Sequence, residues 1–221
     1  MNLTAAAAYG CYHSLKGRLD VVGLSAMTSR IHVPMLPSVD FIEWCTKVNG
    51  TEEVHLIEGN AILLDVLRDS VGTLGVKRGC DMGTCGCCAV LVNGQPRLSC
   101  LTLAAEAERT EITTVEGLAS GAHLHPVQQC FTDYGGSQCG FCTPGFLVVV
   151  SALLENNPEP TDDEIKTAIE GNLCRCTGYQ QIVDSVRGAA ALLAAGRTGD
   201  DKTEPHSDPN PGVPLASEND S

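Results

Sequence analysis

Hydrophobic residues in several runs between positions 41 and 115 alternate with polar ones, a pattern typical of strands that are buried on one face. Asn-Gly pairs, a strong signal for a hairpin turn, follow two of these runs at 49–50 and 93–94. Apolar residues between Ile62 and Gly72 recur instead at helical spacing, which predicts one amphipathic helix against the sheet. This order predicts an α+β domain of the β-grasp ferredoxin type over residues 41–121. Its expected strands lie at 41–48, 53–57, 89–92 and 111–115.

Beyond Gly121 the period of the hydrophobic pattern changes from two residues to about 3.6, which indicates helices. Pro144 suits the first turn of one helix, and Thr161 with Glu164 has the spacing of a capping box at the start of another. Short connections separate the helical stretches. Together they predict a four-helix-bundle domain over residues 122–195. The expected helices lie at 126–134, 146–154, 165–169 and 182–193.

The two ends of the chain show neither period. Residues 1–40 form an N-terminal extension with two open interpretations: a flexible or mispredicted leader, or a segment that packs on a partner chain. Residues 196–221 are rich in Asp, Glu, Pro, Ser and Gly, a composition that predicts an acidic disordered tail. The folded part is therefore expected to consist of the two domains between these ends.

Composition argues against nucleic-acid binding, membrane association and secretion. A formal net charge of -13 over 221 residues argues against nucleic acid or an anionic membrane surface as a partner. No apolar run approaches the length needed to cross a bilayer, and no signal-peptide pattern is found near the start. Twelve cysteines without a secretory signal favour a reducing, cytoplasmic setting over a disulfide framework.

Four cysteines in the first expected domain have the spacing of iron ligands. The stretch GCDMGTCGCCAVLVNGQPRLSC reads C-x4-C-x2-C followed by a fourth cysteine, as in plant-type ferredoxins that bind a 2Fe-2S cluster. Its glycines allow the backbone to wrap around a cluster with N–H groups turned inward, and Lys77 and Arg78 add counter-charge. The fourth cysteine is expected to arrive from a hairpin. The expected ligands are Cys80, Cys85, Cys88 and Cys100.

A second group of four cysteines lies in the helical half, as C-x2-C in QCGFCTPG and C-x-C in GNLCRCTGYQ. These pairs are expected at helix ends that face each other. Structural zinc sites are the alternative for both groups, because C-x2-C also occurs in zinc knuckles. Zinc does not account for the glycine-wrapped loop with its lone fourth cysteine, so iron-sulfur clusters are favoured. The expected ligands of the second cluster are Cys139, Cys142, Cys174 and Cys176.

The other cysteines and the histidines are not expected to bind iron, because each group already supplies four thiolates. Cys87 is either a small buried thiol that fills the loop or a ligand that could replace Cys88, and the first interpretation is favoured. His123 and His125 precede a helix start and are expected to link or cap it. The remaining thiols are expected to be ordinary reduced cysteines: Cys11, Cys45 and Cys130, the last in a helix core.

Together the motifs resemble the small iron-sulfur subunit of the molybdenum hydroxylases, the family of xanthine dehydrogenase, carbon monoxide dehydrogenase and 4-hydroxybenzoyl-CoA reductase. The resemblance covers residues 41–195 and rests on GCDMGTCGCCAVLVNG, SCLTLA, TTVEGLA, QCGFCTPG and GNLCRCTGYQQIV. The combination of QCGFCTPG with GNLCRCTGY is specific, since a plant ferredoxin has no second cysteine domain. Cys87 departs from the family, which commonly has a small apolar residue there.

The resemblance implies that the chain is the non-catalytic subunit of an oxidoreductase heterotrimer. Its partners would be a large subunit that binds a molybdopterin cofactor and a medium subunit that binds FAD. The second group of cysteines would lie nearer the pterin, and the first group nearer the flavin. Gln138 and the backbone at Cys176 would contact the pterin. Electrons would pass from the molybdopterin centre through the two 2Fe-2S clusters to FAD or another acceptor.

No nucleophile with its base, phosphate loop or dinucleotide fingerprint occurs in the sequence, so substrate chemistry is expected in another chain. The alternative function is a free-standing ferredoxin-like carrier that shuttles electrons between soluble enzymes. A carrier should purify as a monomer, whereas a subunit should purify with two larger chains.

Overall fold

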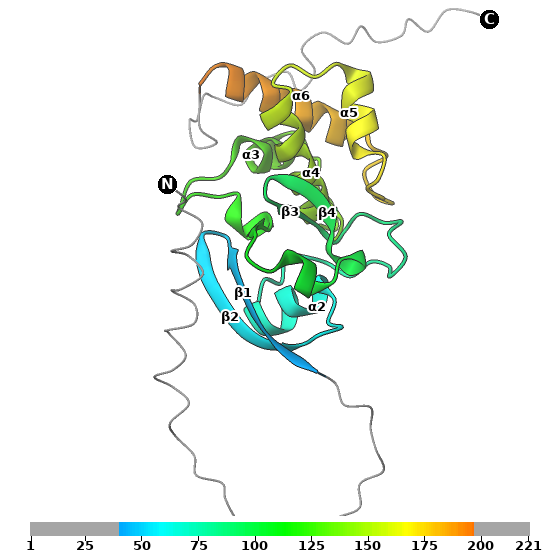
Figure 1. Ribbon diagram of the computed structural model, residues 1–221. Helices are drawn as coiled ribbons and strands as arrows, with labels where there is room; N and C mark the ends of the chain where they lie inside the picture. The colour runs from blue at the N-terminus through cyan, green and yellow to red at the C-terminus, as the bar shows by residue number, and fades with distance from the viewer. Residues whose placement is uncertain (1–39, 197–221) are drawn as a thin grey trace, which may run out of the picture.

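Strands and helices occupy separate parts of the computed structural model, which describes residues 40–196 (Figure 1). The β1–β2 hairpin and α2 lie at one end, helices α3 to α6 lie at the other, and β3 and β4 lie between them. The α+β class predicted from the sequence is confirmed. The predicted N-terminal extension and acidic tail lie outside residues 40–196, so the structure does not describe them.

Five strands within the described residues form one mixed sheet in the order β2-β1-β5-β3-β4. β1 pairs with β2 and β3 with β4 in antiparallel hairpins, while β1 and β5 run parallel. Both hairpin turns, at 49–50 and 93–94, have positive φ at the Asn and the Gly, as the predicted tight turns require. The strands are β1 (Phe41–Val48), β2 (Thr51–Glu58), β3 (Ala89–Val92), β4 (Gln95–Leu98) and β5 (Glu111–Thr113).

Strand β5 is shorter than the predicted strand at 111–115. The Thr114 backbone N–H donates to the Asn49 side chain at 2.8 Å instead of to a neighbouring strand. The chain then enters a 3-10 turn at Val115–Gly117. A side chain from the β1–β2 turn therefore ends the sheet pairing of β5.

The single amphipathic α-helix predicted after β2 is wrong in detail. The segment begins as α2 (Leu63–Asp65) and continues as a π-helix, η1 (Val66–Val71), which ends at Gly72 with φ 86°. Leu63, Leu64 and Leu67 are all fully buried against the sheet. Their spacing is that of one apolar stripe, so the predicted burial is present although the last six residues of the segment are π-helical.

Past residue 121 the predicted four helical stretches are present, and most of them are slightly longer than expected. Pro144 lies in the first turn of its helix, and Thr161 and Glu164 form the predicted capping box, with the Thr161 N–H donating to the Glu164 carboxylate at 2.7 Å. The helices are α3 (Pro126–Asp133), α4 (Thr143–Asn156), α5 (Asp162–Ile169) and α6 (Gln180–Ala194).

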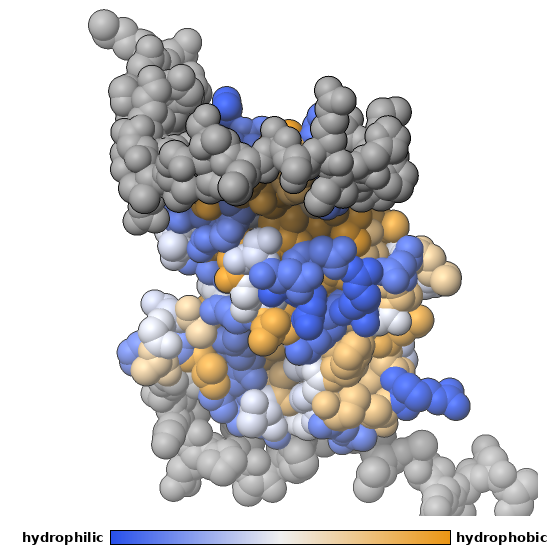
Figure 2. Space-filling view, turned by 90° about the horizontal axis from the view of Figure 1, so that it is seen from below, coloured by the Kyte–Doolittle hydropathy of each residue, from blue (hydrophilic) through white to orange (hydrophobic). Residues whose placement is uncertain are grey.

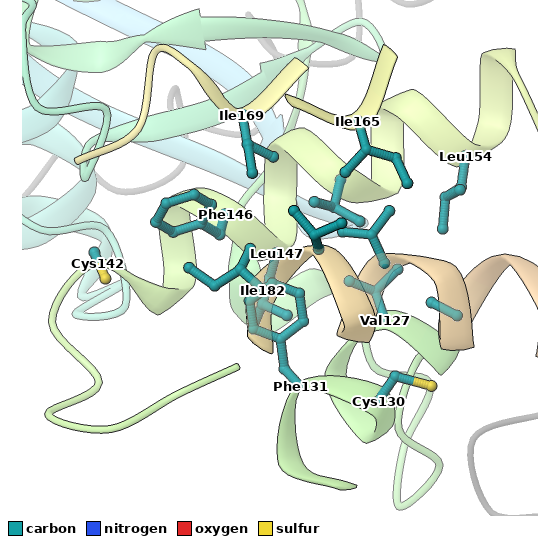
Figure 3. Packing of buried hydrophobic residues seen from close by; sticks show 14 of the residues in the cluster. Val127, Cys130, Phe131, Cys142, Phe146, Leu147, Leu154, Ile165, Ile169 and Ile182 are labelled. Atoms are coloured by element: carbon teal, nitrogen blue, oxygen red, sulfur yellow. The ribbon is translucent and has the colours of Figure 1, made fainter. Parts of the chain in front are cut away.

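Helix α4 is apolar nearly all round because it is covered on several sides. One side packs with the other helices into a core in which Phe131, Phe146 and Ile182 point into the space between the ribbons (Figure 3). Its other side, at Val148 and Ala152, packs on β3. This contact joins the sheet and the helices through apolar side chains.

The surface carries no large apolar band on the side that Figure 2 shows, where apolar patches alternate with hydrophilic ones. Among residues 40–196, no helix combines the length and the hydropathy that a membrane crossing requires.

Candidate functional site

The loop between η1 and β3 and the end of the following hairpin bring the first four cysteines together. Cys80 and Cys85 lie in the loop, and Cys88 directly precedes β3. Because β3 and β4 pair from Ala89 to Leu98, Cys100 returns beside Cys88. Ser99 fixes this junction, since its N–H and its hydroxyl both donate to the Cys88 carbonyl, at 3.2 and 2.7 Å. The structure thus confirms that the fourth cysteine comes from a hairpin.

Thiols of this first quartet meet in two pairs, Cys80 with Cys85 and Cys88 with Cys100. Backbone N–H groups, first that of Met82 and then that of Cys85, lower the pKa of Cys80 to about 6. Burial, followed by the neighbouring Cys88 thiol, raises the pKa of Cys100 to about 11. The backbone N–H groups turned toward Cys80 are the donors that a thiolate ligand needs.

Helix ends place the second quartet, as predicted. Cys142 is the N-cap residue of α4 and Cys139 precedes it, while Cys174 and Cys176 lie in the turn between α5 and α6. These thiols also meet in pairs, Cys142 with Cys174 and Cys139 with Cys176. Cys142 belongs to the helical core, and Figure 3 shows it at one margin of that core.

The electrostatic environment differs between members of the second quartet. Burial, and then the Cys174 thiol, raise the pKa of Cys142 to about 12. Burial also opposes ionisation of Cys174, but the pKa of Cys174 is lowered because Thr177 donates to it from its hydroxyl and its backbone N–H. The Cys174 sulfur and the Thr177 hydroxyl oxygen are 3.2 Å apart. The pKa of Cys176 is raised, chiefly by the thiol of Cys139.

The residues present fit a 2Fe-2S cluster in each quartet. Each iron of such a cluster takes two thiolates, and each quartet supplies two pairs. Within residues 40–196, no three His, Cys, Asp or Glu side chains are grouped as a site for one metal ion. Gly79 leaves room for the first quartet because it has no side chain. A Cβ at this position would lie only 2.8 Å from the Cys85 sulfur. Gly83 beside it has φ +74°, which L side chains rarely adopt.

Lys77 and Arg78 do not act as free counter-charges as the sequence suggested. Arg78 forms ion pairs with Asp65 and Asp81, which raise its pKa, the Asp65 hydrogen bond being the larger cause. The Lys77 ammonium donates to the Leu74 carbonyl at 2.8 Å. Arg78 therefore ties the cysteine loop to the end of α2.

Cys87 lies inside the protein, in agreement with the favoured interpretation. It is 4% exposed, packs with the helical core, and its thiol donates to the Cys85 carbonyl at 3.7 Å. Burial, followed by the Cys85 thiol, raises the pKa of Cys87 to about 12. Cys87 thus packs on the helical core, and its thiol also lies beside that of Cys85.

Two other predictions about non-ligand residues are confirmed and one is wrong. Cys130 is 1% exposed in the helical core, and His125 caps α3 by accepting the Val127 N–H at 3.3 Å. Cys45 is disulfide-bonded, which contradicts the expectation of a reduced thiol. Cys11 lies outside the described residues.

Each quartet borders exposed side chains. Gln138, Cys139 and Cys176 are all exposed, and Phe141 and Leu173 beside them are 46% and 53% exposed. We call these five residues the helical docking face. Next to the first quartet, Met82 and Leu101 are 76% and 60% exposed. We call these two residues the loop docking face.

The quartets also touch each other through the backbone. The Leu173 N–H, one residue before Cys174, donates to the carbonyl of Cys85 at 2.9 Å. The Asn172 side chain donates to the Gly86 carbonyl at 3.1 Å. No signal in the spacing of the cysteines pointed to these contacts, because they join segments that are far apart in the chain.

Comparison with known proteins agrees with this geometry. Residues 43–131 match the model of a 2Fe-2S iron-sulfur cluster binding domain, and residues 114–187 match that of a [2Fe-2S] binding domain. The nicotinate dehydrogenase small FeS subunit of Eubacterium barkeri is 47% identical over 147 residues, which are 66% of this chain and 94% of the relative. The xanthine dehydrogenase iron-sulfur-binding subunit of Escherichia coli O157:H7 is 48% identical over 145 residues, 64% of this chain and 89% of the relative.

A solved structure shows the same fold. The chain superimposes on a chain of quinoline 2-oxidoreductase from Pseudomonas putida 86 with a TM-score of 0.68 and 42% sequence identity. The match covers 71% of this chain and 98% of the other. The likeness therefore spans nearly the whole of a chain from an oxidoreductase.

Proposed function

Because the chain belongs to the family of small iron-sulfur subunits of molybdenum hydroxylases, we propose that it joins a molybdopterin-binding large subunit to an FAD-binding medium subunit. It is an electron-transfer subunit with two 2Fe-2S binding domains, and it performs no substrate chemistry itself. A bound 2Fe-2S cluster supplies a one-electron acceptor and donor. The protein holds two such centres at a fixed separation and tunes each with its own hydrogen bonds.

The helical docking face is the side proposed to meet the large subunit. Cys139 and Cys176 are exposed on it, so the second quartet lies at the surface. Gln138 and the backbone at Cys176 would contact the molybdopterin cofactor there, and Phe141 and Leu173 supply apolar surface for the contact. The second quartet, Cys139, Cys142, Cys174 and Cys176, would then receive electrons first.

The loop docking face is proposed to meet the FAD-binding subunit. Cys80 is partly exposed, and Met82 and Leu101 expose apolar side chains beside it. Exposed apolar residues next to a redox site are typical of a surface that another protein covers. Electrons would leave toward FAD, or another acceptor, from the first quartet: Cys80, Cys85, Cys88 and Cys100.

The domain organisation follows the two quartets. We propose a β-grasp ferredoxin-like domain over residues 41–121 that holds the first quartet, and a four-helix-bundle domain over residues 122–195 that holds the second. The packing of α3 to α6 around one apolar core supports the bundle. The assembly would be a heterotrimer. A cytoplasmic location would agree with the ten described cysteines that are free thiols, because reduced thiols are typical of a reducing compartment.

One observation carries this function: both quartets lie where the sheet and the helices meet. The Leu173 N–H donates to the Cys85 carbonyl at 2.9 Å. This bond connects the residue before Cys174 of the second quartet to Cys85 of the first. A free-standing carrier needs only one cluster and one docking face. The match to small subunits over nearly their whole length favours the subunit over the carrier.

Ligand substitutions test the proposed order of the quartets. Cys176→Ser should lose the second cluster, so that substrate no longer reduces the chain while an artificial donor still reduces the flavin through the first quartet. Cys85→Ser should lose the first cluster and leave reduction of the second by substrate intact. Electron paramagnetic resonance of the purified assembly after rapid mixing with substrate measures both steps.

Wild-type protein provides the reference, with about four irons per chain and both larger subunits present after purification. The proposed order is wrong if both variants lose the same step. The assignment to a subunit is wrong if the chain purifies alone with both clusters and the larger chains are active without it.

A further inference from the structure

Asn172 is a buried polar residue between the two quartets that no ligand role explains. It precedes Leu173 and Cys174, and it is 3% exposed. Its side-chain nitrogen donates to the carbonyl of Gly86 at 3.1 Å, across 86 positions of the sequence. Gly86 lies between Cys85 and Cys87 in the first cysteine loop. The side chain therefore ties the turn of one quartet to the loop of the other.

Three backbone segments approach each other closely around this hydrogen bond. A Cβ at Gly86 would lie 2.4 Å from the Gly171 carbonyl oxygen and 2.6 Å from the Asn172 side-chain nitrogen. A Cβ at Gly145, in the first turn of α4, would lie 2.4 Å from the Gly86 carbonyl oxygen. We call Gly86, Gly145 and Asn172 the inter-quartet seam. Neither glycine has room for a methyl group, so the separation across the seam is set by direct contact.

Asn172 also reaches the second quartet through Tyr179. The Tyr179 hydroxyl donates to the Asn172 carbonyl at 3.2 Å and accepts the Cys174 N–H at 2.9 Å. One residue thus connects by its side chain to the first cysteine loop and by its carbonyl to a ligand-bearing turn. A buried residue that is bonded by its side chain on one side and by its backbone on the other restricts relative movement of the two segments.

We propose that Asn172 is a positioning residue that fixes the separation and orientation of the two quartets, and thereby the rate at which electrons cross between them. The inference rests on the two-cluster function proposed above. The Gly86 carbonyl also accepts the Ala89 N–H at 3.1 Å, so removing the Asn172 side chain takes away only the donor that comes from the turn of the other quartet. Without this link the loop is expected to move away from the turn. Both quartets keep their four cysteines, because Asn172 does not touch a thiol.

The test uses Asn172→Ala in the complete assembly. With both clusters reduced, their magnetic interaction in electron paramagnetic resonance should weaken relative to wild type, while the iron content stays at about four per chain. The amide hydrogen of Leu173 should exchange with solvent about tenfold faster, because its bond to Cys85 lies beside the lost one. A role confined to stability would not change the magnetic interaction of fully loaded protein.

Asn156→Ala is the control for the loss of an asparagine side-chain hydrogen bond, at an exposed position. The Asn156 side chain also donates to a backbone carbonyl, that of Ala152 at 2.7 Å, but the bond stays within α4. This variant should show wild-type magnetic interaction and wild-type exchange at Leu173. A weakened interaction in both variants would attribute the effect to general loosening and overturn the proposal.

Gly145→Ala probes the seam from the opposite side and decides the question if Asn172→Ala does not assemble. The added methyl group must push on the Gly86 carbonyl, so this variant should also weaken the interaction with both clusters present. The proposal is overturned if either variant keeps the wild-type interaction, or if Asn172→Ala assembles but loses the iron of one quartet. Fewer than about four irons in the wild type would instead refute the two-cluster function itself.

Discussion

At the scale of single residues, the two members of a thiol pair have different surroundings. Cys80 lies among backbone N–H groups that lower its pKa to about 6, whereas burial raises the pKa of Cys100 to about 11. Cys87 sits among these ligands but faces the helical core. Cys85 and Cys88 on either side of it bind iron in our proposal, whereas the Cys87 thiol donates to the Cys85 carbonyl.

Cys87→Ala should therefore keep both clusters. Iron content is expected to remain at about four per chain, with visible absorption unchanged. The free energy of unfolding should fall by about 1 kcal/mol, because a small buried group and a weak hydrogen bond are lost. Iron analysis and thermal unfolding measure these effects. Cys88→Ala, one residue on, should lose the first cluster, and an equal loss in Cys87→Ala would show that Cys87 is a ligand.

At the scale of elements, the residues that cap the N-termini of helices are predicted most directly by the sequence. Thr161 and Glu164 form the capping box that their spacing predicts, and His125 caps α3 through a neutral ring nitrogen. Burial lowers the pKa of His125 below its usual value of 6.5, while Glu155 of α4 opposes this shift. The cap therefore depends on the imidazole remaining neutral.

Acid should weaken the start of α3. The pKa of His125 is lower in the folded protein than in the unfolded chain, so its contribution is complete above the ordinary value of 6.5. The contribution is lost as the pH falls through the lower folded value, at a cost of about 1 kcal/mol for a helix cap. Thermal unfolding at pH 7 and pH 5 measures this change. His125→Asn keeps a capping oxygen that does not titrate, so equal pH dependence in both proteins would contradict this role.

At the scale of the whole molecule, two apolar cores are joined by a third, smaller one. The sheet core is centred on Trp44, whose ring N–H donates to the Ala104 carbonyl at 2.7 Å. The helical core is centred on α4, and the contact of Ala89 and Leu91 with Val148 and Ala152 joins the two. Cys88 directly precedes Ala89 of this junction and Cys142 is the N-cap residue of α4, so the packing of β3 on α4 contributes to the spacing of the quartets.

A chain that begins at residue 40 should keep its fold and both clusters. All eight predicted ligands and both large cores lie within the described residues, so iron content should stay at about four per chain. Purification with the partner subunits distinguishes the two interpretations of the extension, because loss of a partner on truncation would show that residues 1–39 pack against it. Loss of a cluster would contradict the prediction.

Much of the fold and of the candidate site could be predicted because local chemistry dominates there. The turns at 49–50 and 93–94 need positive φ, and the cysteine spacing is set by the shape of a cluster. The π-helical form of Val66–Val71 was missed because recurring apolar residues indicate a helix without specifying which backbone carbonyl each N–H bonds. Strand β5 was overextended because the Asn49 side chain captures the N–H of Thr114.

The sequence by itself determined the α+β class, the order of the elements and the spacing of eight cysteines in two groups. Each of these depends on residues that are near one another in the chain: hydrophobic period, turn residues and ligand spacing. Only the tertiary structure decided which thiols pair, that Cys87 faces the helical core, and that Asn172 meets Gly86. These contacts join segments up to 86 positions apart, and their geometry exists only after the sheet and the helices have packed together.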